Sequence, residues 1–171
     1  MRILSHYSKD AGKVFSSGYL SPLDNAHKPG GLWLSDDSEF GWPDLVFGLA
    51  RGGSRDWADG EELLRHRYDF SVRDDETDSV LCLTTPDDLR SFMSRYREAS
   101  PRSCIVDEEL GFGFHIEWNR VKSDYKGILI TPYQQEMSHR RENIGFHWYR
   151  FDCASACIWD ISCLRQLPHQ G

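Results

Sequence analysis

A rigid turn that runs directly into a short apolar strand constrains the fold more than any other feature, at residues 27–37 (His-Lys-Pro-Gly-Gly-Leu-Trp-Leu-Ser-Asp-Asp). Pro29 fixes its own φ, and Gly30 and Gly31 permit either positive φ or a close approach of the backbone. On the pleated strand that follows, Trp33 faces opposite to the leucine on each side of it. We therefore predict a strand that forms one wall of a pocket for a planar ligand.

Size and composition predict one domain. The chain has 171 residues, of which 39% are hydrophobic and 13% aromatic, enough for a compact domain with a sizeable core. We expect a single domain over residues 1–171. The sequence contains no apolar run of about 18 residues that could span a membrane, and its start lacks the apolar segment of a signal peptide. We expect a soluble protein with no membrane partner.

Cysteine usage and charge bear on the compartment and on the partners. The five cysteines form an odd set, and three of them lie among apolar neighbours as small core residues do. This pattern favours a reducing, cytoplasmic location. The formal net charge of −7 argues against broad non-specific binding to DNA or to anionic membranes. His139, Arg140 and Arg141 still form a local basic patch.

Strand and helix patterns alternate along the chain. Period-two alternation and short apolar runs predict strands, whereas helical spacing and capping residues predict helices. The predicted strands cover residues 2–8, 31–35, 67–72, 79–84, 126–132, 148–152 and 156–160, and the predicted helices lie within 9–20, 42–50, 85–99 and 118–125. The glycine-rich, charged residues 51–61 are predicted to form an exposed loop, and residues 134–147 a long polar loop. The fold class is α+β, with mixed or antiparallel sheets and a few short helices.

The helix that begins near residue 85 has the strongest local signals. Thr85 is a good N-cap, a proline occupies the first helical position, and two aspartates follow at the positive end of the helix dipole. Helical spacing predicts a buried face, and Ser100-Pro101 ends the pattern. The residues predicted to form that face are Leu89, Phe92, Met93 and Tyr96.

Common nucleotide, hydrolase and metal motifs are missing from the sequence. Gly111-Phe-Gly-Phe lacks the third glycine and the helix of a dinucleotide fingerprint, and no phosphate-binding loop or Gly-x-Ser-x-Gly elbow occurs. Cys153, Cys157 and Cys163 with His147 match no common zinc spacing. We therefore expect no metal.

Three residues stand out, and each also has an ordinary structural interpretation. His6 at the polar end of the first strand could be a hydrogen-bonded histidine of no further importance. Trp33 could belong to the core, and Ser35 could cap a helix or a turn. Their order along the chain carries more information than any one of them.

That order resembles the start of an ADP-ribosyltransferase-like domain: a histidine on the first strand, a short helix, a glycine turn and a Gly-Leu-Trp-Leu-Ser strand. The resemblance implies that His6 holds the ribose of NAD and that Trp33 stacks on nicotinamide, near Ser35. A cationic pyridinium ring suits an indole face. The neighbouring residues that the resemblance adds to this NAD site are Tyr7, Ser8, Gly31 and Leu32.

The later part of the chain extends the resemblance. Many members carry a late strand written Glu-x-x-Val-aromatic-Asp, whose Glu supports the oxocarbenium-like transition state. The matching stretch is Ser155-Ala-Cys-Ile-Trp-Asp160, so Ser155 stands at the Glu position. Asp152 or Glu136 could supply the missing carboxylate, and proximity in sequence favours Asp152.

The resemblance implies an enzyme that uses NAD as a substrate and transfers ADP-ribose to a macromolecular acceptor, a protein or a nucleic acid. His6, Ser155 and Asp152 would form its catalytic group. A toxin, an effector or a phage-encoded modifier would all fit this activity. One alternative is an inactive module on the same fold that binds a nucleotide or a partner. Another is an RNA- or nucleotide-processing enzyme that uses His6 and the basic patch.

Overall fold

A computed structural model describes residues 2–16, 28–53, 59–97, 105–107, 111–113, 116–134 and 151–168. The strands are β1 (Leu4–Ser8), β2 (Leu32–Ser35), β3 (His66–Val72), β4 (Val80–Leu83), β5 (Ile105–Asp107), β6 (Gly111–Gly113), β7 (Gly127–Ile130), β8 (Ser155–Ile158) and β9 (Leu164–Gln166). The helices are α1 (Trp42–Arg51), α2 (Gly60–Leu63), α3 (Pro86–Tyr96) and α4 (Trp118–Asp124), and two 3₁₀ turns lie at Asp74–Ser79 and Ile161–Cys163.

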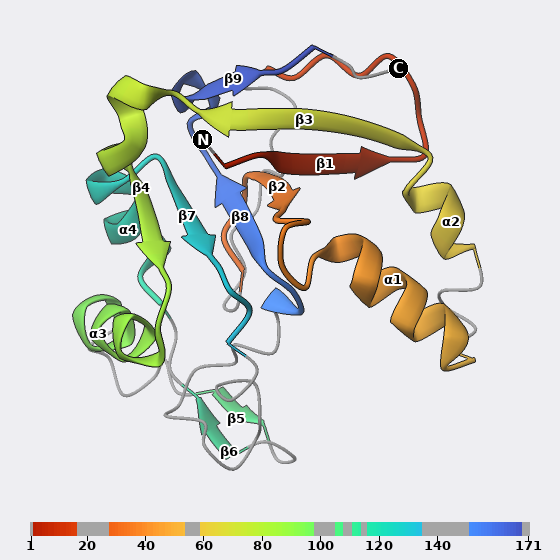
Figure 1. Ribbon diagram of the computed structural model, residues 1–171. Coiled ribbons are helices and arrows are strands. Elements are labelled where there is room, and N and C mark those ends of the chain that lie inside the picture. The colour runs from red at the N-terminus through yellow and green to blue at the C-terminus, as the bar shows by residue number, and fades with distance from the viewer. Residues whose placement is uncertain are drawn as a thin grey trace.

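One curled sheet of seven strands forms the centre of the molecule, in the order β4-β7-β8-β2-β1-β3-β9 (Figure 1). β4 and β7 pair in parallel, and the other neighbouring strands pair antiparallel. β5 and β6 form a separate two-stranded hairpin. The predicted α+β class with a mixed sheet is confirmed.

The sheet parts between β1 and β2. These two strands share a single paired position, Ser5 with Ser35, whereas β1 pairs with β3 over five positions and β2 with β8 over four. Beyond Ser5, β1 runs away from β2, so that β1 and β3 cross the direction of β2 and β8 (Figure 1). The space between β1 and β2 beyond this position is therefore open to side chains and to solvent.

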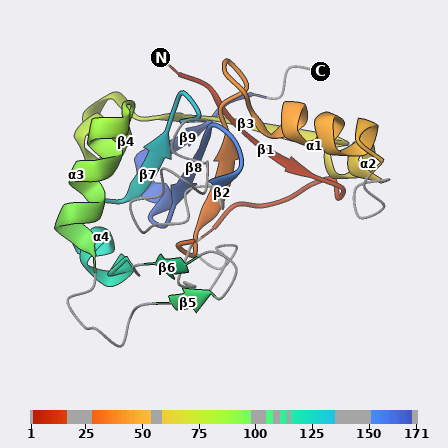
Figure 2. The same cartoon turned by 90° about the horizontal axis from the view of Figure 1, so that it is seen from below.

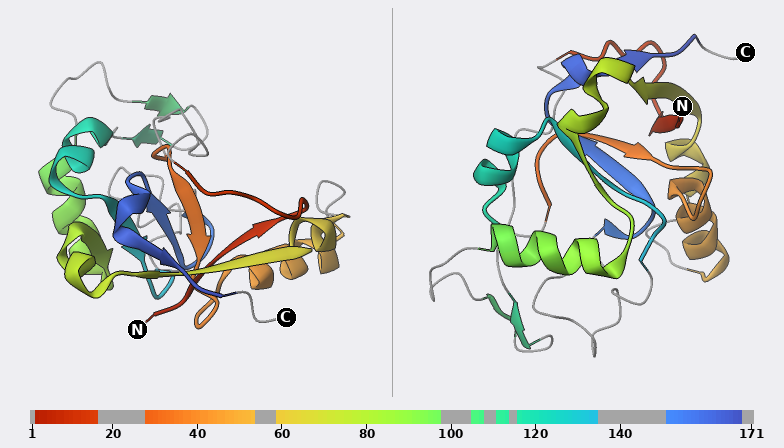
Figure 3. Two further views of the ribbon diagram at one scale, coloured as in Figure 1. Left: turned by 90° about the horizontal axis from the view of Figure 1, so that it is seen from above. Right: turned by 60° about the vertical axis from the view of Figure 1, so that its left-hand side comes forward.

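Helices gather at the two ends of the curled sheet. Figure 2 shows α3 and α4 beside β7, and α1 and α2 at the far end of β1; the two views in Figure 3 show the same separation. The helices predicted at 42–50 and 118–125, and the one predicted to begin near residue 85, are confirmed. In α3, the Thr85 hydroxyl accepts a hydrogen bond from the Asp88 amide at 3.1 Å, and the Asp88 carboxylate accepts one from the Thr85 amide at 2.9 Å, which is a reciprocal capping box.

Two apolar clusters lie on opposite faces of the sheet. Leu32 and Leu34, each 2% exposed, belong to one cluster together with Leu4 and Phe70. Trp33 points the other way and contacts the second cluster, which α3 supplies with the predicted residues Leu89, Phe92, Met93 and Tyr96. The alternation predicted for this strand is therefore confirmed.

Gly31 makes the close approach that the sequence allowed. A Cβ placed there would lie 2.7 Å from both the Cys157 sulfur and the Ile158 carbonyl oxygen. Positive φ among the described glycines occurs at Gly12 and Gly53 instead. The turn at residues 29–31 thus brings β2 against β8 by removing a side chain, not by a left-handed backbone.

Several sequence predictions of local structure were wrong. Residues 9–16 form bends and coil in place of the predicted helix, and 17–20 lie outside the described residues. β4 lies at the edge of the sheet with Cys82 exposed, so residues 79–84 are not a fully buried strand. Phe151 and Asp152 precede β8 without joining a strand, while residues 148–150 are not described. Part of the loop predicted at 51–61 is helical in α2.

Candidate functional site

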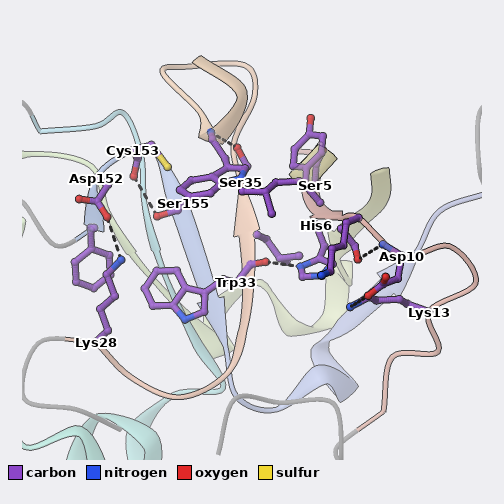
Figure 4. Close-up of a pocket in the computed structure, with 17 residues that line it drawn as sticks. Ser5, His6, Asp10, Lys13, Lys28, Trp33, Ser35, Asp152, Cys153 and Ser155 are labelled. Atoms are coloured by element: carbon purple, nitrogen blue, oxygen red, sulfur yellow. Dashed lines mark hydrogen bonds and ion pairs between the residues drawn. The ribbon is translucent and has the colours of Figure 1, made fainter. Parts of the chain in front are cut away.

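A cavity of about 470 Å³ lies where β1 and β2 part. Its walls come from β1 and the segment after it, from β2, from the starts of α1 and β8, and from residues 151–153 (Figure 4). Most of the predicted site residues line this cavity: His6, Tyr7, Ser8, Trp33, Ser35, Asp152 and Ser155. Gly31 and Leu32 do not line it, since both are buried against neighbouring strands.

The imidazole of His6 spans the parting of the strands. Its Nδ1 lies 3.0 Å from the carbonyl oxygen of Trp33, and because a carbonyl only accepts, Nδ1 carries the hydrogen. Burial lowers the pKa of His6 below 6.5, and the positive charge of Lys13 acts in the same direction, against the effect of the Trp33 hydrogen bond. The ring is therefore neutral near pH 7, and its Nε2 is an acceptor.

Trp33 presents its indole to the same cavity. The ring is half-buried and packs at 5.4 Å, tilted by 57°, against Phe151. The ammonium of Lys28 lies over the indole, 5.1 Å from the ring centroid. Aromatic and cationic groups thus meet at one wall of the cavity.

Lys28 also pairs with Asp152. The ammonium donates to the carboxylate at 3.1 Å, and both side chains are partly exposed. Asp152 has a φ of 62°, in the left-handed region that aspartate tolerates better than most residues. This backbone turn directs the carboxylate toward Lys28 and the cavity (Figure 4).

The two predicted serines contribute hydroxyls that already have partners. Ser155 is 5% exposed, and its hydroxyl donates to the Cys153 carbonyl at 3.1 Å. The Ser35 hydroxyl donates to Asp37 at 2.5 Å and accepts from the Trp42 amide at 2.7 Å, which satisfies an otherwise orphaned amide at the start of α1. Ser35 therefore caps this helix as well as lining the cavity.

Tyr7 and Ser8 line the cavity, and their hydroxyls already have partners. The Tyr7 hydroxyl donates to Asp37 at 2.5 Å, and its pKa is raised, first by burial and then by this carboxylate. The Ser8 hydroxyl accepts from the Asp10 amide at 3.0 Å. Both residues shape the walls near His6.

Lys28 and Phe151 were missed as site residues by sequence reasoning. Lys28 belongs to the turn at residues 27–37, where its pattern indicates only an exposed lysine. Its partner Asp152 is 124 positions away. No local periodicity encodes a contact of that separation, so only the proximity of Asp152 to the late strand pointed to this part of the site.

The described residues contain no cluster of three or more histidine, cysteine or acidic side chains that could hold a metal ion. Burial raises the pKa of the Cys153 thiol to about 12 and that of Cys163 to about 11, so neither is a thiolate at neutral pH. Nor does any helix in the described part of the chain have the length and apolar character to span a bilayer. Glu136, His139, Arg140, Arg141 and His147 lie outside the described residues.

Comparison with known proteins found no counterpart: no protein-family model, curated protein or solved structure matches the chain.

Proposed function

We propose that the protein is an NAD-consuming ADP-ribosyltransferase with an ADP-ribosyltransferase-like fold. One observation carries the proposal: the imidazole of His6 and the indole of Trp33 line a single cavity at the parting of β1 and β2, where His6 Nδ1 donates to the backbone carbonyl of Trp33. An acceptor nitrogen suits a ribose hydroxyl, and an indole face suits a flat cationic ring. NAD contains both groups, because its nicotinamide ring is bonded directly to a ribose.

The chemistry requires breaking the bond between nicotinamide and ribose. The electron pair of that bond goes to the pyridinium nitrogen, which leaves as neutral nicotinamide, and the anomeric carbon gains oxocarbenium character. A nucleophile on the acceptor then forms a new bond to this carbon and gives up its proton. A fixed negative charge near the carbon stabilises such a transition state.

Asp152 is the residue we assign to that charge. It lines the cavity with Trp33 and Ser155, whereas Ser155 itself is neutral and bonded to a carbonyl. His6 would hold the ribose, and Trp33 would bind the ring.

The test is incubation of the pure protein with NAD labelled in its adenylate part, together with a cell lysate. Labelled acceptor and free nicotinamide are the expected products, and His6→Ala and Trp33→Ala should each lose most of the turnover. His66→Ala is the matched control. His66 lies on β3, where it pairs with Ser8 of β1, but it does not line the cavity. Absence of turnover in the wild type, or full turnover in His6→Ala, would refute the proposal.

A second candidate function is an NAD- or partner-binding module without turnover. The neutral Ser155 at the position of the family's Glu favours it, as does the engagement of Asp152 with Lys28. Calorimetric titration with NAD separates the two candidates. Binding that depends on His6 and Trp33, together with zero release of nicotinamide, would select the binding module.

A further inference from the structure

The face of Trp33 that lines the cavity already holds a cation. The Lys28 ammonium lies 5.1 Å from the centroid of the indole and 3.1 Å from the Asp152 carboxylate. Figure 4 shows the three side chains together, drawn from the turn before β2, from β2 itself and from the turn before β8. An aromatic face and a carboxylate that contact the same ammonium define a site for a single positive charge.

The contacts of the Lys28 ammonium with Trp33 and with Asp152 are of a kind that a ligand can replace. Its side chain is 34% exposed and that of Asp152 is 42% exposed, so solvent screens the ion pair, and such pairs contribute little. A cation over a partly exposed ring is also a weak contact. The four-carbon stem of lysine is flexible, so the ammonium can move into solvent without a change in the backbone.

We propose that Lys28 is a displaceable occupant of a pyridinium subsite formed by Trp33 and Asp152, and that this subsite selects a positively charged ring over an uncharged one. An entering pyridinium replaces the ammonium at both contacts, over the indole and beside the carboxylate. A neutral ring replaces neither. This inference rests on the proposed function, because that function supplies the reason for a pyridinium in this cavity.

Discrimination between ring charges follows from the same two contacts. An oxidised nicotinamide ring carries a positive charge, whereas the reduced ring and free nicotinamide do not. Once the bond to ribose breaks, the departing ring is neutral and loses its attraction to Trp33 and Asp152. The Lys28 ammonium can then return to both, which favours release of the ring.

The test uses 1-methylnicotinamide, a pyridinium with no ribose, followed by isothermal titration calorimetry. Lys28→Met keeps the length of the side chain and removes the competing charge, so it should bind the probe about threefold to tenfold more tightly than the wild type. Lys9→Met is the matched control. Lys9 lines the same cavity and is exposed. The Lys9→Met substitution therefore removes the same charge without opening the Trp33 face, and it should change the affinity for the probe by less than about twofold.

A second variant tests the carboxylate. In the Lys28→Met background, Asp152→Asn should reduce the gain, since asparagine tolerates the left-handed backbone at this position but carries no charge, while the uncovered indole still binds the probe. The wild type should bind 1-methylnicotinamide more tightly than nicotinamide. Thermal unfolding of each variant verifies that the fold is intact.

Three results would overturn the inference: a Lys28→Met affinity equal to or weaker than that of Lys9→Met, a gain that Asp152→Asn leaves undiminished, or a wild-type preference for nicotinamide. The probe cannot donate ADP-ribose, so these outcomes are independent of turnover. A shift with this probe but no cleavage of NAD would leave the pyridinium subsite standing while the proposed function fails. Cleavage of NAD without a change in affinity for 1-methylnicotinamide would leave the proposed function standing while the pyridinium subsite fails.

Discussion

Gly31 leaves no room for a side chain between β2 and β8. A methyl group there would press on the Cys157 sulfur and on the Ile158 carbonyl oxygen, each 2.7 Å away. The second of these is backbone and cannot rotate aside. We predict that Gly31→Ala lowers the free energy of unfolding by about 1–3 kcal/mol, measured by urea denaturation.

Gly48 provides the contrast for this prediction. It lies inside α1, and a Cβ there would meet no atom within 4 Å. Gly48→Ala should raise the free energy of unfolding by about 0.5–1 kcal/mol, because alanine restricts the unfolded chain and favours helix. Equal effects of the two substitutions would contradict the account of the turn at residues 29–31.

His6 makes stability depend on pH. Burial lowers the pKa of the folded-state imidazole below 6.5. At pH values between this lowered pKa and 6.5, the unfolded chain therefore binds more protons than the folded one. The contribution is present above pH 6.5 and is lost as the pH falls through 6.5 toward the folded-state pKa. Between pH 7.5 and 5, the wild type should therefore lose more stability than His6→Gln, whose amide can still donate to the Trp33 carbonyl.

Urea denaturation at a series of pH values provides the measurement. Carboxylates whose pKa values are lowered, such as Glu76 and Asp88, titrate at lower pH and are common to both proteins. The difference between the two curves therefore isolates the imidazole. Parallel curves would show that residue 6 does not titrate in a buried setting.

At the level of single elements, α3 depends on its cap. The Thr85 hydroxyl accepts from the Asp88 amide, and its loss leaves that amide without its side-chain partner. We predict that Thr85→Ala costs about 1 kcal/mol in thermal or urea unfolding. Thr85→Ser keeps the hydroxyl and should cost much less. Indistinguishable stabilities for alanine and serine would rule out a capping role.

Elements with strong local signals were predictable from the sequence, and those that depend on distant partners were not. The cap at Thr85 and the proline at the start of α1 act within one turn of helix, so they predicted both helices correctly. Residues 9–16 have the apolar spacing of a short helix, but Phe15 packs instead against Phe70 and Tyr68 on β3. Tertiary contacts of this kind override weak helical propensity.

The edge strands illustrate the same limit. β4 has the apolar composition of a central strand, yet one side of it carries no partner strand among the described residues. β9 is a short strand that pairs with β3, and its sequence, Leu-Arg-Gln, has no strand signal of its own. The position of a strand within a sheet is set by the partners it pairs with.

Across the whole molecule, Asp36 joins the two halves of the parted sheet. Its carboxylate is fully buried and accepts from Arg2, just before β1, at 2.9 Å and from Thr131, just after β7, at 2.5 Å. The Ser38 hydroxyl donates to it as well, at 2.6 Å. We predict that Asp36→Ala lowers the free energy of unfolding by about 3 kcal/mol, because Thr131 then keeps a buried hydroxyl without this acceptor.

Arg2→Ala should cost less, about 1 kcal/mol, since the guanidinium is 44% exposed and the buried carboxylate keeps its hydrogen bonds from Thr131 and Ser38. Urea denaturation of both variants provides the comparison. The reverse order, with Arg2→Ala the more damaging, would mean that the ion pair with Arg2, and not the hydrogen bonds from Thr131 and Ser38, holds the two halves together.

The candidate site was predictable in part. The order of His6, the glycine turn and Trp33 along the chain pointed to residues that line one cavity. The parting of β1 from β2, which creates that cavity, has no local pattern in the sequence. It depends on the pairing of β1 with β3 and of β2 with β8. The contact between Lys28 and Asp152 forms only once β2 and β8 have paired.

A crystal structure of the protein soaked with NAD tests the central claim most directly. The proposal predicts the nicotinamide ring on the indole of Trp33 and a ribose hydroxyl within hydrogen-bonding distance of the His6 imidazole. An empty cavity at saturating NAD, or NAD bound at another surface, would contradict the claim that this cavity is an NAD site.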